Sequence, residues 1–345
     1  MTTALALVAA LGAQATAPVP QPAIDGVIDA LRVHQLVAIT DPHGNAGMRD
    51  FLRRLVADPR FADTVNDIVL EVGNARYQAL VDDYVNGAQI DEFALAEAWL
   101  NTTVANQISA DIELFRLVRR INAQRPAGRR LRLLLGDPPI DWSTVKTRAD
   151  HNGFLAQRDS YPAALVQTAI LAKGRKGLIV YGHLHFQRRN VASNFETGDW
   201  RFETMVSLIE RAGPTRVFAI WRLEEDLLQV FPPAATWPVP AIASVAGTSL
   251  GALDAGRLTP KWPRIRAVDG KPVPVPKEEY ATLPIERQLD AVLYLGPNSR
   301  QPIEPSSEPC RRPGFLEERL RRITLTGIPK FEADFVRKLC GAPAQ

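Results

Sequence analysis

Three acids and three of the five histidines of this chain stand at the ends of short apolar runs. They are Asp41 and His43 after Leu36–Thr40, Glu71 within Ile68–Val72, Asp137 after Leu131–Leu135, and His183 and His185 after Leu178–Tyr181. An imidazole beside a carboxylate can take a proton from water, and histidine and acidic side chains can also bind a divalent metal ion. These residue types therefore indicate hydrolytic or metal chemistry.

The spacing of these residues adds to that interpretation. Asp41 and His43 are two residues apart, as are His183 and His185, so each pair points to one side if the chain stays extended. His183 and His185 are thus candidate ligands of a divalent metal ion. A carboxylate inside an apolar run, such as Glu71, is costly to bury without a partner. Structural alternatives stay open, because Asp before Pro is common in turns and a single His after a strand is often a loop residue.

The apolar runs must position these side chains. The four runs given above and a fifth, Val217–Trp221, are four or five residues long with little polar alternation, which is typical of strands buried on both faces. Helical patterns lie between them, at Met48–Ala57, Ala75–Val85, Glu92–Gln124, Tyr161–Ala172 and Phe202–Arg211. This alternation predicts an α/β fold with a mostly parallel sheet flanked by helices. In such sheets ligands bind outside the carboxyl ends of the strands, where these polar residues fall.

The first residues predict export. Ala4–Gly12 is apolar, and Ala13-Gln14-Ala15 is a small-x-small triplet of the kind that signal peptidases cut after, although no Lys or Arg precedes the apolar run. We therefore interpret residues 1–22 as a signal peptide and a Pro-rich leader, with residues 1–15 removed. The mature protein would be periplasmic or secreted.

Two further segments follow the leader. Residues 23–231 form the predicted α/β domain, and residues 232–345 a Pro-rich, loop-rich extension with short helices at Phe315–Arg322 and Pro329–Leu339. The two cysteines, Cys310 and Cys340, either pair in an oxidising compartment or remain free thiols.

Composition and missing motifs exclude several classes of protein. The net charge is only +3 and the Lys and Arg residues are scattered, which argues against a nucleic-acid partner, and no apolar stretch is long enough to cross a bilayer. The chain has no G-x-S-x-G elbow, Walker-type glycine loop, G-x-G-x-x-G or CxxC motif. A hydrolase of this sequence would activate water rather than form an acyl-serine, and its substrate would be a small molecule or a peptide.

The dipeptide Arg158-Asp159 precedes the helical pattern before His183. Asp159 could cap that helix, whereas Arg158 could reach an anionic or carbonyl oxygen above the edge of the sheet. We take Arg158 and Asp137 as candidate substrate-binding residues, although Asp137 before Pro138-Pro139 is also typical of a turn.

Taken in order, four motifs of this chain resemble those of the superfamily that contains the erythromycin esterases, the ChaN-like haem-binding uptake proteins and the Tiki proteins. The motifs are Thr40-Asp41-Pro42-His43-Gly44, Ile68-Val69-Leu70-Glu71, Arg158-Asp159 and Tyr181-Gly182-His183-Leu184-His185. The match covers residues 30–190. Two departures stand out: the first acid of the family is usually Glu after Gly, and Tyr161-Pro162 replaces its usual Met-Ala.

The resemblance implies an α/β fold with a site at the carboxyl ends of the strands. In that site His43 would activate water, Asp41 and Glu71 would be its acidic partners, and His185 or His183 would complete it.

The superfamily spans ester hydrolysis, metal-dependent peptide cleavage and haem binding, so two functions remain. The first is an exported hydrolase of an ester or amide, with or without a divalent metal. The alternative is an envelope haem- or ligand-binding protein without catalysis, in which Tyr181, His183 or His185 would be an axial ligand. We favour the hydrolase, because an iron-porphyrin site would not need the surplus carboxylates. A degenerate relative with a structural role is a third possibility.

Overall fold

The computed structural model gives the arrangement of most of the chain. It describes residues 15–105, 110–188, 203–223, 228, 231–255, 265–268, 271–274, 283–297, 301–328 and 330–343. The expected signal peptide falls on residues 1–15, of which only the last lies within the described residues.

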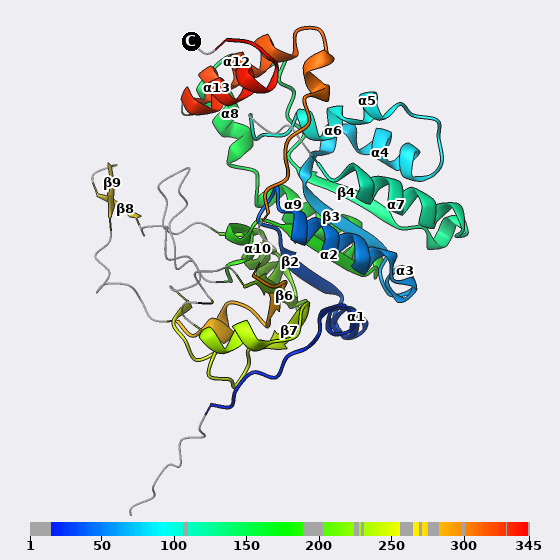
Figure 1. The fold of residues 1–345 in the computed structure, drawn as a ribbon, viewed down its shortest axis with the longest axis vertical. Helices are drawn as coiled ribbons and strands as arrows, with labels where there is room; N and C mark the ends of the chain where they lie inside the picture. The colour runs from blue at the N-terminus through cyan, green and yellow to red at the C-terminus, as the bar shows by residue number, and fades with distance from the viewer. Residues whose placement is uncertain are drawn as a thin grey trace, which may run out of the picture.

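A single large sheet organises the described part of the chain (Figure 1). Its strand order is β1 (Gln21–Pro22), β7 (Ala241–Ser244), β10 (Ala291–Tyr294), β6 (Val217–Arg222), β2 (Leu36–Thr40), β5 (Gly177–Tyr181), β3 (Asp67–Asn74) and β4 (Arg132–Asp137). The six strands from β10 to β4 are parallel, and β7 and β1 add an antiparallel edge. The predicted α/β class with a mostly parallel sheet is confirmed.

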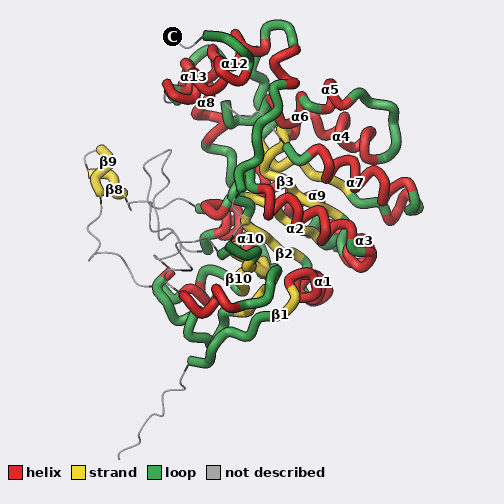
Figure 2. The backbone as a smooth tube through the Cα atoms, viewed as in Figure 1, coloured by secondary structure: helices red, strands yellow, loops and turns green. Residues whose placement is uncertain are grey.

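The position of β5 determines where polar side chains can meet. Gly177 at the start of β5 pairs with Leu36 of β2 on one side and with Asp67 of β3 on the other. The carboxyl ends of β2, β5 and β3 are therefore neighbours, although these strands are far apart in the sequence. The loops that follow these strands therefore lie at the same end of the sheet, whose strands Figure 2 draws in yellow between the helices.

Helices cover both faces of the sheet. One face packs against α1 (Ala23–Val33), α2 (Ala46–Ala57), α3 (Pro59–Thr64), α4 (Gln78–Val85) and α7 (Ile112–Ala123), and the other against α9 (Ser160–Ala169) and α10 (Met205–Ala212). In β2, Val37 and Ile39 face the first group of helices, and Leu36 and Ala38 the second. Every residue of β2 and β5 is buried, which explains their unbroken apolar runs.

The expected long helix over residues 92–124 is divided in the structure. It consists of α5 (Glu92–Leu95), α6 (Glu97–Leu100) and α7. The chain after α6 leaves the helical path because its polar groups bind elsewhere: the carbonyl of Thr102 accepts from Trp142 Nε1 at 2.9 Å, and the backbone amide of Thr103 donates to Asp137 at 2.7 Å. The prediction of one continuous helix was wrong.

The sheet also takes strands from the segment beyond residue 231. β7 and β10 are short but almost fully buried, and β10 pairs in parallel with β6. A separate two-stranded sheet joins β8 (Ile265–Val268) to β9 (Lys271–Pro274).

Two helices close the chain, α12 (Phe315–Thr326) and α13 (Lys330–Leu339), close to the two short helices expected there. A disulfide joins Cys310 to Cys340, with 5.3 Å between their Cα atoms. Of the two alternatives for the cysteines, the structure therefore shows the pair. No helix among the described residues combines the length and the apolar character needed to cross a membrane.

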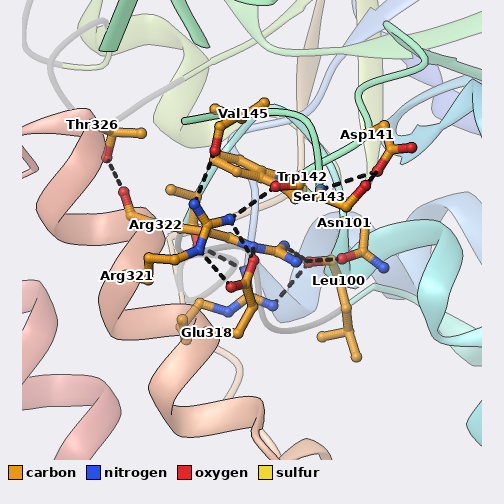
Figure 3. Close-up of polar contacts among 12 residues, drawn as sticks. Leu100, Asn101, Asp141, Trp142, Ser143, Val145, Glu318, Arg321, Arg322 and Thr326 are labelled. Carbon is orange, nitrogen blue, oxygen red and sulfur yellow. Dashed lines mark hydrogen bonds and ion pairs between the residues drawn. The ribbon is translucent and has the colours of Figure 1, made fainter. Parts of the chain in front are cut away.

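Arginines fasten α12 to the loops that follow α6 and β4 (Figure 3). Arg321 donates to the carbonyls of Trp142 and Val145, each at 2.9 Å, and Arg322 donates to Asn101 Oδ1 at 2.8 Å. Glu318 accepts from both guanidinium groups. These contacts anchor the C-terminal helices at the same end of the sheet as the polar strand ends.

Candidate functional site

The loop after β2 turns His43 toward the neighbouring strands. His43 and Gly44 have φ angles of +55° and +60°, so two consecutive residues are left-handed before Asn45 caps α2 by accepting from the amide of Met48 at 2.9 Å. A left-handed conformation is unfavourable for a residue with a Cβ and is typical of functional turns. The amide of His43 donates to Asp41 Oδ1 at 3.1 Å, which stabilises this turn.

Glu71 lies at the centre of the candidate site. Its side chain in β3 is 8% exposed and is held by Arg158 Nη2 at 2.6 Å and by the amide of Gly182 at 2.5 Å. His43 Nε2 lies 3.2 Å and His185 Nε2 3.4 Å from its two carboxylate oxygens. Burial alone would raise the pKa of Glu71, but the two imidazoles outweigh burial and hold its pKa well below the usual range. Glu71 is therefore an anion in the folded protein.

His185 is fixed from both sides. Its Nδ1 donates to Asp159 Oδ1 at 2.8 Å, and the same oxygen accepts from the amide of Met205 at 2.6 Å. Burial opposes protonation of His185, but Asp159 and Glu71 overcome burial and raise its pKa to about 10. Asp159 stands at the N-cap position of α9 without capping it through its side chain. Its carboxylate serves His185 instead, so the alternative that Asp159 caps the helix was wrong.

Five side chains thus form a connected line, Asp159, His185, Glu71, His43 and Asp41, which we call the polar row. At its far end His43 Nδ1 lies 3.6 Å from Asp41 Oδ2, and the His43 side chain is 45% exposed. Burial lowers the pKa of His43, but Glu71 and Asp41 act against burial and raise the pKa overall. Because nearly half of the ring is exposed, solvent screens part of this attraction.

His183 and His185 do not lie on an extended strand. The chain leaves the extended path after Gly182 and forms a 3-10 turn over His183–Phe186. The ring of His183 lies edge-on to Trp221, with 5.6 Å between centroids, whereas the ring of His185 lies edge-on to Tyr181 at 5.4 Å. Among the residues that the structure describes, no three His, Cys, Asp or Glu side chains are arranged to hold a metal ion. The extended path on which the spacing argument depended is therefore absent, and the assignment of His183 and His185 as metal ligands stays a prediction.

Asp137 is buried next to the polar row. It accepts from the amide and from the hydroxyl of Thr103. Burial raises the pKa of Asp137 to about 7, although the bonds from Thr103 and the charge of Arg158 counteract burial. The carboxyl of Asp137 thus holds a structural loop, and its role toward a substrate stays a prediction.

A cavity of about 380 Å³ opens beside the polar row. Asp41, His43 and Glu71 form its polar end, while Leu70, Leu114 and Phe115 belong to its apolar wall. The size is in the range of small-molecule binding sites.

Part of the cavity wall comes from the C-terminal segment, through Ile303, Pro305 and Phe335. This segment runs over the loop that carries His43, because the amide of Ile303 donates to the carbonyl of Gly44 at 2.9 Å. The amide of Ala46 in turn donates to the carbonyl of Gln301 at 3.0 Å. The segment beyond residue 231 therefore helps to build the site, which the sequence did not indicate.

The sequence did not predict the contributions of Gly182, Arg49 and Asp159 to the site. A Cβ at Gly182 would lie 3.2 Å from Glu71 Oε2 and 3.3 Å from His43 Nε2, so the absence of a side chain there lets these groups approach the turn. Arg49, in the first turn of α2, also lines the cavity, and it belongs to none of the motifs described above. The sequence predicted Asp159 only as a helix cap within Arg158-Asp159, because the spacing along the chain gives no sign of its bond to His185.

No protein-family model and no curated protein sequence matches this chain. Solved structures with a similar course of the backbone include a succinoglycan biosynthesis protein, at 10% identity, 83% of this chain, 96% of that chain and a TM-score of 0.55. A protein of Bacillus cereus matches at 10% identity over 83% of this chain and 97% of its own, with a TM-score of 0.49. ChaN of Campylobacter jejuni, described with cofacial haem, matches at 9% identity over 58% of this chain and 85% of its own, with a TM-score of 0.34. At 10% identity the likeness to the succinoglycan biosynthesis protein is one of fold alone.

Proposed function

We propose that this protein is a hydrolase of an ester or amide that activates water with the polar row. The observation that carries the proposal is the position of His43, a partly exposed imidazole between the carboxylates of Glu71 and Asp41 at the wall of a ligand-sized cavity. The motif resemblance to the erythromycin esterase, ChaN-like and Tiki superfamily is in keeping with this function, and the similarity of fold in the solved structures does not extend to it.

The reaction follows from the groups at the polar end of the cavity. The oxygen of a water molecule attacks the carbonyl carbon of the substrate while a ring nitrogen of neutral His43 accepts the proton of that water. The bond from the carbonyl carbon to the leaving group then breaks, and the leaving alcohol or amine departs with the proton from His43. Glu71 and Asp41 stabilise the imidazolium that exists between these two steps.

The remaining residues hold these groups in position. Arg158 and the amide of Gly182 fix Glu71, and Asp159 fixes His185 against the other carboxylate oxygen. Such fixation by neighbouring hydrogen bonds is what a catalytic imidazole and its acid require.

The candidate haem ligands fit the alternative function less well. Tyr181 is 1% exposed and a Cβ on Gly136 would lie only 1.8 Å from its hydroxyl, so this oxygen is enclosed. His185 is 8% exposed, with Nδ1 bonded to Asp159 and Nε2 3.4 Å from Glu71, so its ring is less accessible to a ligand than that of His43. His183 remains as the third candidate, against Trp221. Mixing the protein with haemin and recording the Soret band tests this alternative, since a binding protein would shift the band.

The decisive experiment is an activity assay on a panel of 4-nitrophenyl esters and peptide amides with wild-type protein and two variants of His43. His43→Asn is the sharper variant, because Asn tolerates the left-handed conformation at this position and cannot act as the base. His43→Ala tests the same group without a polar side chain. We expect both to lose turnover by 100-fold or more, on the order of one general-base contribution, while remaining folded. Full activity of His43→Asn on a substrate that the wild type hydrolyses would overturn the proposal.

The proposal extends to the compartment. The leader interpretation and the disulfide both suit an exported protein, periplasmic or secreted, because disulfides persist in oxidising compartments. Mass spectrometry of the protein from envelope or culture fractions should find a chain that begins at Thr16. An intact Met1 or Thr2 would contradict export by this route.

A further inference from the structure

Among the described residues that line the cavity, one cation is not used by the polar row. Arg49 lies on α2, one turn beyond Asn45, and lines the same cavity as His43 and Glu71. Its side chain is partly buried, and it makes no hydrogen bond or ion pair with any residue that the structure describes. A guanidinium that has lost water without gaining a partner is unfavourable, so this position calls for an anion from outside the chain.

The acids nearest to Arg49 are already committed. Asp111 accepts from Nε of Arg53 with both of its carboxylate oxygens at 3.0 Å. Asp41 accepts from the amide of His43 and belongs to the polar row. Burial lowers the pKa of Arg49, although Asp111 and Asp41 counteract burial from a distance. Arg49 is thus the cation of the cavity wall that is left without a carboxylate among the described residues.

The rest of the wall determines what accompanies the anion. Apart from Arg49, His43, Gly44 and the acids, the described lining is aliphatic or aromatic, with Leu52 of α2, Leu114 and Phe115 of α7, and Phe335 of α13. These side chains favour a hydrocarbon body, because burying apolar surface contributes about 25 cal/mol per Å². An Arg guanidinium binds a carboxylate through two parallel hydrogen bonds, which fixes the orientation of such a ligand.

We infer that the cavity binds an apolar molecule that bears a carboxylate, with the carboxylate on Arg49 and the hydrocarbon body against Leu52, Leu114, Phe115 and Phe335. In calling this ligand the substrate, the inference rests on the proposed function: the ester or amide bond lies at His43, and the carboxylate of the same molecule is a specificity group. Binding of the carboxylate itself does not depend on hydrolysis.

The binding test uses the pair 4-phenylbutyrate and 4-phenylbutyramide, which share a hydrocarbon body and differ in charge. Isothermal titration with the full chain should give a Kd for the carboxylate at least tenfold below that for the amide. Arg49→Met should weaken binding of the carboxylate at least tenfold and leave the amide unchanged, whereas Arg49→Lys should restore part of the difference. Arg54→Met is the matched control, because Arg54 lies on the same helix, is 57% exposed and pairs with Asp50 outside the cavity. Equal affinity of wild type for the two compounds, or no effect of Arg49→Met, would overturn the inference.

The turnover test separates this inference from the proposed function. The neutral substrate is 4-nitrophenyl butyrate and the anionic one is the mono-4-nitrophenyl ester of glutaric acid. We expect Arg49→Met to raise KM for the anionic ester alone, with kcat little changed. A fall in kcat on both esters would make Arg49 a group that stabilises the oxyanion and would overturn the inference while leaving a hydrolase. Carboxylate binding that depends on Arg49, without turnover of any ester or amide, would overturn the hydrolase and leave the binding site.

Discussion

Charge alternates along the polar row, from the carboxylate of Asp159 through protonated His185, ionised Glu71 and His43 to the carboxylate of Asp41. Each member lowers the electrostatic energy of its neighbours, which explains why the pKa of His185 rises while that of Glu71 falls. A buried charge without its partner is far more costly than the pair. Removing one member should therefore disturb the residues on either side of it.

Glu71→Gln tests this coupling. The amide keeps the size of the carboxylate but removes its charge and presents an NH₂ group to a donor, either Arg158 or the amide of Gly182. We expect turnover to be lost and the free energy of unfolding to fall by about 3–5 kcal/mol, as measured by urea denaturation, because buried cations lose their partner.

The control for Glu71→Gln is Glu92→Gln. Glu92 also pairs with an arginine, Arg116, but it is 36% exposed and outside the cavity. Its loss should cost no more than about 1 kcal/mol. Similar destabilisation by both variants would show that Glu71 gains nothing from its position between the imidazoles.

The raised pKa of His43 has a consequence for the pH dependence of activity. A general base must be neutral, and Glu71 and Asp41 keep His43 protonated to higher pH than a free imidazole. We expect kcat/KM to increase with pH, with a slope near one on a logarithmic scale, and to level off only above the raised pKa of His43. A rate that falls as pH rises through this range would show that His43 acts as an acid. The Asp41→Asn variant, which removes one carboxylate beside His43, should move the curve to lower pH.

At the scale of elements, the backbone comes closest to the polar row at Gly182, in the turn between β5 and the 3-10 helix, where the amide of Gly182 donates to Glu71. Gly182 has φ of −61°, a value that any residue adopts, so alanine would fit the backbone. Its methyl group would meet Glu71 Oε2 at 3.2 Å and His43 Nε2 at 3.3 Å.

We therefore expect Gly182→Ala to lower kcat tenfold or more by displacing these two groups, with little change in thermal stability. Gly153→Ala is the control, because a Cβ there meets nothing within 4 Å and the residue lies within α8 (Arg148–Leu155). That control should leave activity unchanged and stabilise slightly, by about 0.5–1 kcal/mol. Unchanged kcat in Gly182→Ala would mean that the distances around Glu71 do not matter for turnover.

The sequence predicted the central elements well because they are governed by burial alone. β2, β3, β4, β5 and β6 are apolar on both faces, so each can be recognised without its neighbours. β7 and β10 are equally buried but only four residues long, and in a proline-rich region their pattern is too short to predict a strand. The continuous helix expected over residues 92–124 was wrong because the backbone amide of Thr103 donates to Asp137 and the carbonyl of Thr102 accepts from Trp142, instead of continuing a helix.

The candidate site could be located from the sequence only as a set of strand ends. That Asp41, His43, Glu71 and His185 meet depends on β5 lying between β2 and β3, which is a property of the whole sheet. The different ring contacts of His183 and His185 depend on a turn of the backbone, and the bond from His185 to Asp159 depends on the packing of α9 beside that turn. Arg49 belongs to no motif. That it lines the cavity and has no hydrogen-bonded partner among the described residues can be seen only in the folded chain.

At the scale of the whole molecule, the C-terminal segment contacts the site at two places, the loop of His43 and the apolar wall of the cavity. It passes over the loop of His43, contributes Ile303 and Pro305 to the cavity, and returns in α13 with Phe335. The disulfide between Cys310 and Cys340 ties the beginning of this helical region to its end, and arginines of α12 fasten it to the loops that follow α6 and β4. This covalent link lies outside the cavity and joins the end of α13, which carries Phe335, to the chain before α12.

Breaking this link should act on stability and on ligand binding together. A disulfide that closes a loop of 30 residues lowers the conformational entropy of the unfolded chain and so raises its free energy by roughly 3–4 kcal/mol. The double variant Cys310→Ser, Cys340→Ser should lose about that much free energy of unfolding. Because α13 is then held only by its non-covalent contacts, binding of 4-phenylbutyrate should weaken several-fold, while Arg49 and the polar row stay in place. A reducing agent should reproduce both effects in the wild type and have none on the double variant, which separates the disulfide from other actions of the reagent. Unaltered binding in the double variant would show that Phe335 is held by the packing of α13 on α12 alone.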